Sequence, residues 1–501
     1  MSPDLVVAVD CSTTAVKAVV LGAEQEVLAE ASAPLATSQP RPLWHEQDAR
    51  EWWTGTRTAI SAAVAQVDAA RVGAICLTHQ RETFVCLDAD GEPLRPAILW
   101  VDARAHEEIA SLGTTEVHRV SGKPADTTPA IYKLAWLSRH EPAVMDRAAR
   151  IGDVQAYLAW RLTGAWATSR ASADTLGLLD LKQGDWSPAL LELAGVRREQ
   201  LPFLVPAGHA IGELTAVAAA DLGLAGPVML VAGIGDGQSA GLALGAAEPG
   251  VAYLNLGTSM VLGVRADGYV WDRAFRTLDG MVPGTFTLET VLNAAAYLAS
   301  WFRRELGTGA VDDATEIALL EEAAARVPIG SDGLLTLPYW NAAQTPYWDP
   351  LARGAVVGLH GAHTRAHLYR SILEGVALEL RLHLEGIEAA TGSEIVTLRA
   401  VGGGARSPLW ARIVADVTQR VVVVCAVGEV SAAGSGALAR AWLEGHPDAP
   451  TWGAPAGVEV VPDPAAAERC SSLFAVYRGL YPALRESFAS VSRLRETSRS
   501  T

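Results

Sequence analysis

The chain has 501 residues, half of them hydrophobic, a formal net charge of -16 and five cysteines. This length predicts two or three domains. The acidic balance argues against nucleic acid or an anionic membrane as a partner, because both need a basic surface. No run of 18 or more apolar residues suggests a membrane span, and residues 1–7 lack the basic region of a secretory signal. The absence of that signal favours a cytoplasmic protein. The cysteines are scattered and form no C-x-x-C pair, so we expect reduced thiols.

The first predicted element is a strand, turn and strand over residues 5–21. Asp10 ends the first strand, and Ser12, Thr13 and Thr14 form a hydroxyl-rich turn. Asp10 is suited to place a Mg²⁺ ion through water, and the threonines are suited to donate to phosphate oxygens. A plain β-hairpin with Thr turn bonds is the alternative.

A related strand, turn and strand returns at residues 250–264. Its turn contains Gly257 and Thr258. Two such hairpins, far apart in one chain, predict two similar α/β domains that face one nucleotide.

A polar run interrupts two predicted strands between residues 74 and 88. Gln80, Arg81 and Glu82 have no structural reason to lie in the middle of a sheet, and their donors and acceptors suit vicinal hydroxyls. Trp100 and Asp102 follow, and they are candidates for completing a polar pocket with an aromatic wall. A surface ion pair between Arg81 and Glu82 is the alternative reading.

Asp236 lies in a glycine-rich turn between a short apolar strand at residues 227–232 and a predicted helix at residues 239–244. Glycines on both sides let a ligand approach the backbone, so Asp236 is placed like a catalytic base. An ordinary turn aspartate is the alternative.

The other predicted elements are mostly helical. We expect helices and loops over residues 105–225, including a helix at 151–164 closed by Gly164. A long amphipathic helix is predicted at 367–390, followed by strands at 395–400 and 421–424 and a tightly packed helix at 432–442. Three glycines at 402–404 open another helix, and the polar residues 490–501 are expected to fray.

Two common nucleotide-binding patterns are absent. Gly122-Lys123 is followed by Pro124, which excludes a P-loop, and Gln238 stands where a dinucleotide fingerprint needs its third glycine. Phosphate loops without either pattern favour the actin-like ATPase plan, in which two domains close over ATP.

Six motifs occur in an order that resembles the FGGY carbohydrate kinases. They are Asp10-x-Ser-Thr-Thr-x-x-x-Lys17, Glu46-Gln-Asp with Trp52-Trp53, Pro93-Leu-x-Pro-Ala-Ile-Leu-Trp100-x-Asp-x-Arg104, Gly233-x-Gly-Asp236, Gly257-Thr-Ser and Gly402-Gly-Gly-Ala-Arg-Ser-Pro-Leu-Trp410. The resemblance implies an α/β chain of two actin-like (ribonuclease H-like) ATPase domains with an interdomain cleft. We place them at 1–247 and 248–489, with 490–501 as a polar tail.

The resemblance also implies ATP and Mg²⁺ and transfer of the γ-phosphoryl group to a sugar or polyol hydroxyl. Asp236 is then the catalytic base and Asp10 the metal residue. The substrate-binding set is Gln80, Arg81, Glu82, Asp102 and Asp236. The nucleotide-binding set is Ser12, Thr13, Thr14, Lys17, Gly257, Thr258, Gly402, Gly403, Gly404 and Ser407. Two positions depart from the family, because Ser12 replaces a glycine and Gly237 replaces the glutamine of glycerol-type enzymes.

The substrate motifs point in two directions. His79-Gln-Arg-Glu-Thr83 looks like the glycerol kinase motif, whereas Thr345-Pro-Tyr-Trp-Asp-Pro and the triple-glycine run look more like xylulokinases. Near the helix that supplies a tyrosine to glycerol in glycerol kinases, the chain reads Thr127-Thr128, with Tyr132 shifted along. We expect a ketose or polyol of about pentose size, D-xylulose first and glycerol second. A sugar or nucleotide sensor without turnover is the alternative from another class, and the family's frequent homodimers favour a dimer.

Overall fold

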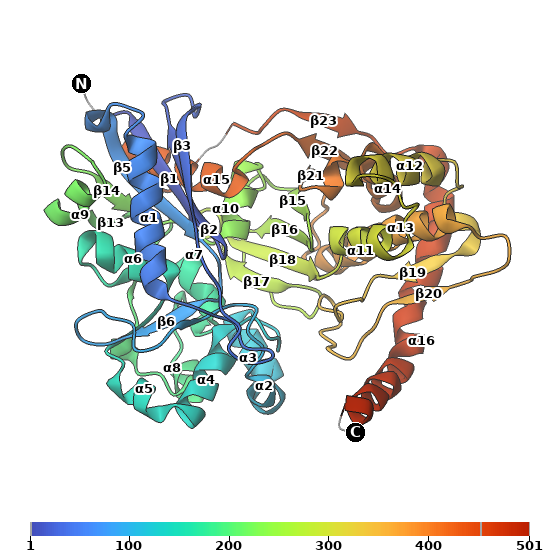
Figure 1. The fold of residues 1–501 in the computed structure, drawn as a ribbon, viewed down its shortest axis with the longest axis horizontal. Helices are drawn as coiled ribbons and strands as arrows, with labels where there is room; N and C mark the ends of the chain where they lie inside the picture. Colours follow the sequence, from blue (N-terminus) through green and yellow to red (C-terminus); the bar gives the residue numbers. More distant parts are fainter. Residues whose placement is uncertain (1–2, 451–452, 500–501) are drawn as a thin grey trace.

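The first large sheet is built around the predicted hairpin (Figure 1). In the computed structural model, which describes residues 3–450 and 453–499, its strand order is β13-β14-β5-β1-β2-β3. β1 pairs antiparallel with β2 and parallel with β5, as expected of a hairpin joined to a crossover. The strands are β1 (Leu5–Cys11), β2 (Ala15–Leu21), β3 (Val27–Pro34), β5 (Val72–His79), β13 (Ala210–Glu213) and β14 (Met229–Val231).

The second large sheet repeats this plan. Its order is β17-β18-β16-β15-β21-β22-β23, with β15 and β16 as the antiparallel hairpin and β21 parallel to β15. The strands are β15 (Val251–Leu256), β16 (Met260–Ala266), β17 (Arg276–Asp279), β18 (Phe286–Leu292), β21 (Thr397–Val401), β22 (Val421–Cys425) and β23 (Gly457–Val460). Both predicted hairpins are therefore confirmed, and neither contains an edge strand of its sheet.

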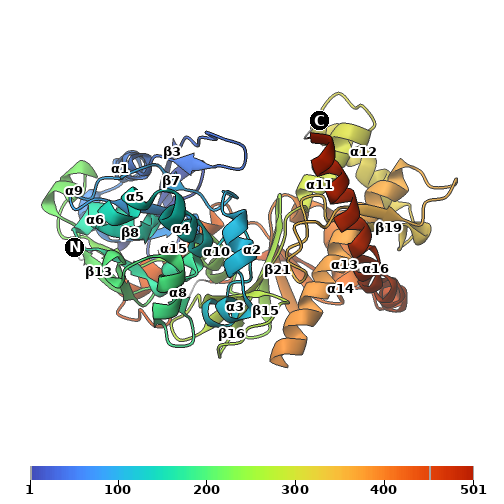
Figure 2. The same cartoon turned by 90° about the horizontal axis from the view of Figure 1, so that it is seen from below.

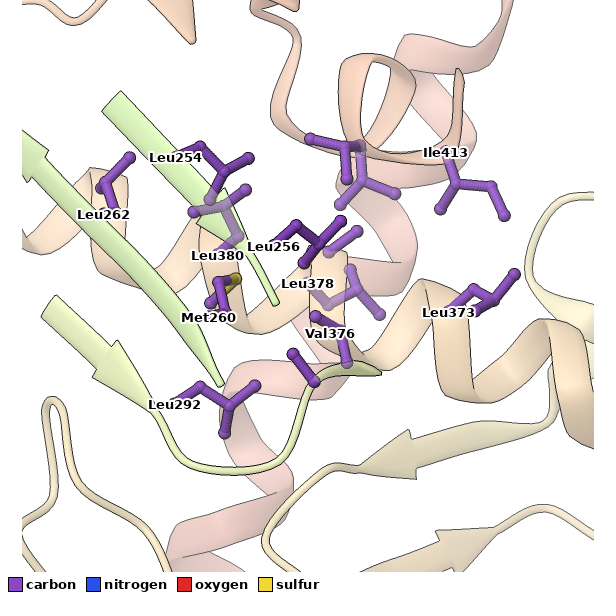
Figure 3. Close-up of a cluster of buried hydrophobic side chains, with 14 of the residues drawn as sticks. Leu254, Leu256, Met260, Leu262, Leu292, Leu373, Val376, Leu378, Leu380 and Ile413 are labelled. Carbon is purple, nitrogen blue, oxygen red and sulfur yellow. The ribbon is translucent and has the colours of Figure 1, made fainter. Parts of the chain in front are cut away.

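Helices cover both faces of each sheet. Apolar residues of β1 alternate, so that Leu5, Val7 and Val9 face α1 (Ala49–Val64) and α6 (Val154–Thr163). The outer face of the second sheet packs on α11 (Ala296–Leu306), α13 (Arg365–Thr391), α14 (Pro408–Thr418) and α16 (Ala467–Arg499). Figure 3 shows this core, where Leu254, Leu256 and Met260 of the strands lie against leucines and Val376 of α13.

Two helices lie between the sheets and join them. α10 (Asp236–Ala243) and α15 (Val430–Leu443) share one apolar cluster that includes Val6 of β1 and Tyr253 of β15 (Figures 1 and 2). α15 belongs to the predicted second domain, yet Arg440 Nη2 donates to the backbone oxygens of Asp4 and Gly22 at 2.8 Å each. The predicted domain boundary at 247/248 therefore separates two parts of the sequence, but residues from both parts share the hydrophobic core between the two sheets.

Most of the remaining helices form a layer beside the first sheet, whereas α12 (Asp313–Ala325) packs on α13 in the second half of the chain, and the remaining strands are short. The helices are α2 (His106–Leu112), α3 (Thr115–Ser121), α4 (Ala130–His140), α5 (Pro142–Arg147), α7 (Arg170–Ala173), α8 (Pro188–Ala194), α9 (Ala216–Asp221) and α12 (Asp313–Ala325). The short strands are β4 (Glu46–Gln47), β6 (Phe84–Leu87), β7 (Ala97–Ile98), β8 (Arg150–Asp153), β9 (Ala167–Ser169), β10 (Leu179–Asp180), β11 (Asp185–Trp186), β12 (Phe203–Val205), β19 (Leu335–Leu337) and β20 (Ala355–Val357). Among the described residues, no helix is both long and apolar enough to cross a membrane.

Three predictions of secondary structure are wrong in part. Residues 105–225, where only helices and loops were expected, also contain the strands β8 to β13, and β13 pairs with β14 at the edge of the first large sheet. The helix predicted at 151–164 begins only at Val154, because Asp153 ends β8 and its Oδ1 caps the helix by accepting from the Ala156 N–H at 2.7 Å. The tail predicted to fray from residue 490 continues α16 to Arg499, and the Ser492 hydroxyl donates to the Leu351 backbone oxygen at 3.3 Å. Residues 500–501 lie outside the described part of the chain.

Candidate active site

A cavity of about 440 Å³ lies between the two halves of the chain. We call it the cleft cavity. Both hairpin turns reach it, through Ser12 and Thr13 on one side and Ser259 on the other. The other residues that line it are Arg81, Glu82, Trp100, Val101, Thr127, Thr128, Asp236, Val261, Arg276, Val291, Asn293, Asn341 and Gln344. Its size and mixed polar lining are typical of a small-molecule site.

Asp236 is the first residue of α10 and is half-exposed to the cleft cavity. Its Oδ1 forms a salt bridge with Arg81 Nε at 3.0 Å and accepts a hydrogen bond from the Gly237 backbone N–H at 2.7 Å. Within the described residues Oδ2 makes no hydrogen bond, so one oxygen is held while the other is open to the cavity. This arrangement suits a carboxylate that accepts a proton from a bound hydroxyl.

Steric contacts with Arg81 and Glu289 explain why glycines flank Asp236. A Cβ on Gly235 would lie 2.3 Å from Arg81 Cδ, and a Cβ on Gly237 would lie 2.9 Å from Arg81 Nη2 and 3.0 Å from Glu289 Oε2. The departure at Gly237 therefore makes room for the arginine that holds the aspartate.

Arg81 belongs to a charged network that crosses the cleft cavity. Its Nη1 donates to Glu289 Oε2 at 3.0 Å, and the other carboxylate oxygen of Glu289 accepts from Arg276 Nε at 2.7 Å. Arg276 Nη1 then donates to Glu82 Oε1 at 2.7 Å. Two arginines thus face three carboxylates, and charges from both halves of the chain hold the site together.

Glu289 is the buried centre of this network, with no exposed surface. Burial would raise the pKa of its carboxyl, but Arg276, Arg81 and the Tyr253 hydroxyl lower it to about 2. The Tyr253 hydroxyl donates to Glu289 Oε2 at 2.6 Å. Sequence analysis missed Arg276, Glu289 and Tyr253. A lone glutamate in the middle of the apolar strand β18 was the available signal, because buried carboxylates need partners.

Glu82 has a backbone φ of 65°, in the left-handed region that non-glycine residues rarely adopt. The conformation turns its side chain into the cleft cavity, where Thr128 Oγ1 also donates to Glu82 Oε1 at 3.0 Å. Thr127 and Thr128 line the cavity just before α4, whereas Tyr132 is buried in the helical layer. The cavity wall just before α4 thus carries two short threonines, and the tyrosine lies away from the cavity.

Gln80 supports the cavity wall from behind. It is buried, its Oε1 accepts from Thr13 Oγ1 at 3.0 Å, and its Nε2 donates to Gln47 Oε1 at 3.0 Å. Thr13 Oγ1 also accepts from Trp100 Nε1 at 3.0 Å, which fixes the predicted aromatic wall. Gln80 is therefore a positioning residue in this structure, and Arg81 and Glu82 make the surface of the cavity.

Asp102 does not line the cleft cavity, contrary to its predicted role in substrate binding. It is fully buried, and both of its oxygens bind Arg104, through Nε at 2.9 Å and Nη2 at 2.7 Å. Its Oδ2 also accepts from the His45 backbone N–H at 2.6 Å. A carboxylate with these partners organises the loop around Trp100 and has no oxygen left for a substrate.

Asp10 has features that fit a divalent cation. Its Oδ1 is buried and has no hydrogen-bond partner, and burial and then the nearby Asp236 raise the pKa of its carboxyl to about 7, with Lys17 opposing. No group of three or more His, Cys, Asp or Glu residues suited to a metal exists in the described ranges. Mg²⁺ commonly takes one or two carboxylates, with phosphate oxygens and water completing its shell. Asp10, with Asp236 beside it, matches that donor set.

Lys17, predicted to bind phosphate, pairs with Glu429 in this structure. The Nζ···Oε2 distance is 2.8 Å, and both side chains keep about two-fifths of their surface exposed, 41% and 38%. The two residues lie 412 positions apart, so the ion pair joins β2 to the start of α15. Because the pair is exposed, its net free energy is small and an anionic ligand can compete for Lys17.

The turns predicted to hold phosphate have well-defined local structures. Ser12 Oγ donates to the Ala15 backbone oxygen at 2.8 Å and so closes the first turn, and Thr14 is exposed beside it. In the second turn, the backbone oxygens of Gly257 and Thr258 accept from the N–H groups of Ala296 and Ala295 at 2.9 and 3.0 Å. These bonds attach the second turn to the start of α11.

The three glycines differ in their surroundings. A Cβ on Gly402 would lie 2.7 Å from the Leu256 backbone oxygen, and one on Gly404 would lie 2.8 Å from Trp410. Gly403 is exposed with no atom within 4 Å of its Cβ position, which leaves one face open for a flat ligand. Ser407 caps α14, because its Oγ accepts from the Trp410 N–H at 3.0 Å.

Comparison with known families identifies this architecture. The model of the N-terminal domain of the FGGY family of carbohydrate kinases matches residues 5–243, and the model of the C-terminal domain matches residues 252–442. The chain is an FGGY carbohydrate kinase. As a member of this family it is a sugar kinase that uses ATP and a sugar or polyol, and the expected two-domain actin-like fold is confirmed.

Individual members of the family are similar to this FGGY kinase along most of its length. Xylulose kinase of Escherichia coli (strain K12) is 30% identical over 88% of this chain and 90% of the relative. Glycerol kinase of Citrifermentans bemidjiense is 33% identical over 83% of this chain and 85% of the relative. The crystal structure of xylulose kinase from Rhodospirillum rubrum has 31% identity and a TM-score of 0.90, and it covers 97% of this chain and 100% of that one. Relatives with different substrates are thus about equally similar.

Proposed function

We propose that this FGGY kinase transfers the γ-phosphoryl group of ATP to a hydroxyl of a ketose or polyol of about pentose size, with D-xylulose favoured and glycerol as the alternative. The observation that carries the proposal is Asp236, whose open Oδ2 faces a cavity bordered by both hairpin turns. The acceptor hydroxyl and the terminal phosphate would meet at this oxygen.

Each side chain has a role that its surroundings support. Asp236 accepts the proton of the attacking hydroxyl, while Arg81 keeps its Oδ1 in place at 3.0 Å. The turns around Thr13 and Thr258 bind phosphates, and the open face at Gly403 receives adenosine. Asp10 would hold Mg²⁺, which would neutralise phosphate charge when bound. Phosphoryl transfer depends mainly on such positioning and charge stabilisation.

The charges in the cleft cavity favour a neutral acceptor. Arg81 and Arg276 would attract a sugar acid if they were unpaired, but Glu82, Glu289 and Asp236 already bind them. A carboxylate on the substrate would then add a negative charge to a site that has no free cation facing it in the described structure. Ketoses and polyols avoid this cost.

The shape of the cavity favours a substrate longer than glycerol. Short side chains stand at Thr127 and Thr128, and Tyr132 is buried away from the cavity. Polar groups of Asn293, Asn341 and Gln344 extend the lining into the second half of the chain. A pentulose has hydroxyls to reach both walls, and this is why D-xylulose is placed before glycerol.

A substrate panel tests the proposal. ADP release would be coupled to a spectroscopic readout and measured with D-xylulose, other ketoses, glycerol, longer polyols and D-gluconate. We expect the highest kcat/KM with D-xylulose and little turnover with gluconate. Highest kcat/KM with glycerol would establish the alternative, and highest kcat/KM with gluconate would contradict the argument from paired arginines.

A further inference from the structure

The side-chain amide of Gln344 has one satisfied end and one unsatisfied end. Its Nε2 donates to Asp126 Oδ2 at 2.7 Å, whereas its Oε1 is buried and has no hydrogen-bond partner. Gln344 is only 9% exposed. A buried acceptor without a partner is unfavourable, because it has lost its hydrogen bonds to water and gained none in the protein.

Gln344 lines the cleft cavity, and this unsatisfied oxygen is unusual there. Among the described residues that line the cavity, Gln344 alone carries a buried side-chain N or O atom without a partner. The arginines opposite and Glu82 are already paired, and Glu82 accepts from both Thr128 and Arg276. The Oδ2 of Asp236, also unpaired in the described structure, is the oxygen proposed to act as the base. Gln344 Oε1 is therefore the one buried polar side-chain atom in the described lining of the cleft cavity that still lacks a hydrogen-bond partner.

Asp126 fixes which end of the amide is left unpaired. Its other oxygen, Oδ1, accepts from the Thr127 backbone N–H at 2.8 Å. Burial raises the pKa of the Asp126 carboxyl, and the hydrogen bonds from Thr127 and Gln344 oppose that rise. A carboxylate only accepts hydrogen bonds, so it binds the NH₂ end of the amide and leaves the oxygen unpaired.

We propose that Gln344 Oε1 accepts a hydrogen bond from a substrate hydroxyl other than the one that Asp236 deprotonates, and that this contact selects acceptors carrying a hydroxyl at that position. The inference rests on the proposed function and narrows its substrate class to ketoses and polyols with this second hydroxyl. The selecting contact spans the two halves of the chain, because Gln344 and Asp126 lie 218 positions apart.

The test compares substrates that each lack one hydroxyl. For the parent enzyme, kcat/KM is measured with the best ketose or polyol of the panel and with each of its single-deoxy analogues. The same set is measured with Gln344→Met, which keeps the length of the side chain and removes the acceptor, and with Gln66→Met, an exposed glutamine outside the site, as control.

We expect one hydroxyl position at which the parent and the control lose about 10-fold or more in kcat/KM and Gln344→Met loses almost nothing further. At the remaining positions all three proteins should discriminate alike. Asp126→Asn should give an intermediate loss at the same position, because an asparagine can pair with either end of the amide.

Two failures are distinguishable. If the parent phosphorylates a ketose or polyol and Gln344→Met and Asp126→Asn both keep its full discrimination at every position, the role of Gln344 is overturned while the proposed function stands. If the parent phosphorylates no ketose or polyol, the proposed function is overturned together with the inference that rests on it. A general fall in kcat/KM that is equal for all analogues would show a structural role only and would also reject the proposal.

Discussion

Arg276 of β17 and Glu82 of the β5–β6 turn form a salt bridge of 2.7 Å although they lie 194 positions apart. Each residue reaches the cleft cavity from a different sheet. Through Glu289 and Arg81 the bridge continues to Asp236, so the proposed base is oriented by charges from both halves of the chain.

Replacing Glu289 with glutamine should destabilise the protein strongly. The change leaves two arginines with too few carboxylates in a buried site, and the loss of one partner from a buried ion pair costs about 3–5 kcal/mol. Tyr253→Phe removes one hydrogen bond to the same carboxylate and should cost about 1–3 kcal/mol. Urea unfolding of both variants measures whether Glu289→Gln lowers the free energy of unfolding more than Tyr253→Phe does. Equal decreases in the two variants would contradict the central role of Glu289.

Asp236→Asn should remove most of the activity without removing ATP binding. General base catalysis contributes about 10²–10⁴-fold, so kcat should fall by that factor. Steady-state kinetics measure the fall, and calorimetric titration with ATP measures the binding. Asp267→Asn, on an exposed carboxylate outside the cavity, is the control. A variant that retains more than about a tenth of kcat would exclude Asp236 as the base.

Acidification should destabilise the protein partly through His118. Burial, followed by the charge of Lys123, lowers the pKa of this imidazole from 6.5 to about 4. Between those values the unfolded chain binds a proton that the folded protein does not, so the free energy of unfolding falls as pH decreases. His118→Gln should weaken this dependence between pH 6.5 and 4 and change nothing in its slope above pH 7.5, as judged by unfolding at a series of pH values. The exposed His446→Gln serves as control, and identical pH profiles for parent and His118→Gln would reject the assignment.

Lys17→Met should raise the KM for ATP more than the KM for the sugar. If Lys17 binds phosphate, it must exchange its contact with Glu429 for the nucleotide. Glu429→Gln removes the competitor and should lower the KM for ATP or leave it unchanged. Because the pair is exposed, neither change should alter stability by more than about 1 kcal/mol. An unchanged KM for ATP in Lys17→Met would show that Lys17 does not bind phosphate and serves only in its ion pair with Glu429.

Substitutions at the adjacent Gly402 and Gly403 should have different effects, one on stability and the other on ATP binding. Gly403→Ala meets no protein atom within 4 Å, so it should leave the melting temperature unchanged and raise the KM for ATP. Gly402→Ala places a side chain at a φ of 96° and against the Leu256 backbone, so it should lower the melting temperature. An unchanged KM for ATP in Gly403→Ala would show that adenosine does not bind against Gly403.

The parts of the site that sequence predicted are those set by local chemistry. Asp236, Arg81 and Glu82 stand in turns next to buried strands, where polar residues are conspicuous, and the two hairpins follow from strand alternation and turn residues. Arg276, Glu289 and Gln344 were missed because each has a partner in the first half of the chain, Glu82, Arg81 and Asp126 respectively, that is 194 to 218 positions away, and no local pattern identifies those partners. For Asp102 the prediction placed the residue correctly near Trp100 but gave it the wrong role. Its carboxylate oxygens are already hydrogen-bonded to Arg104 and to the His45 backbone N–H.

The position of α15 has a consequence for how the chain folds during synthesis. One face of the first sheet is completed by residues 430–443, nearly at the end of the sequence. A nascent chain that has emerged only as far as residue 247 presents Val6, Ala8 and their neighbours without this cover, and exposed apolar strands of this kind attract chaperones or other chains. The first half of the enzyme is therefore synthesised early but finished late, and truncation before α15 should yield insoluble protein even though both hairpins are present.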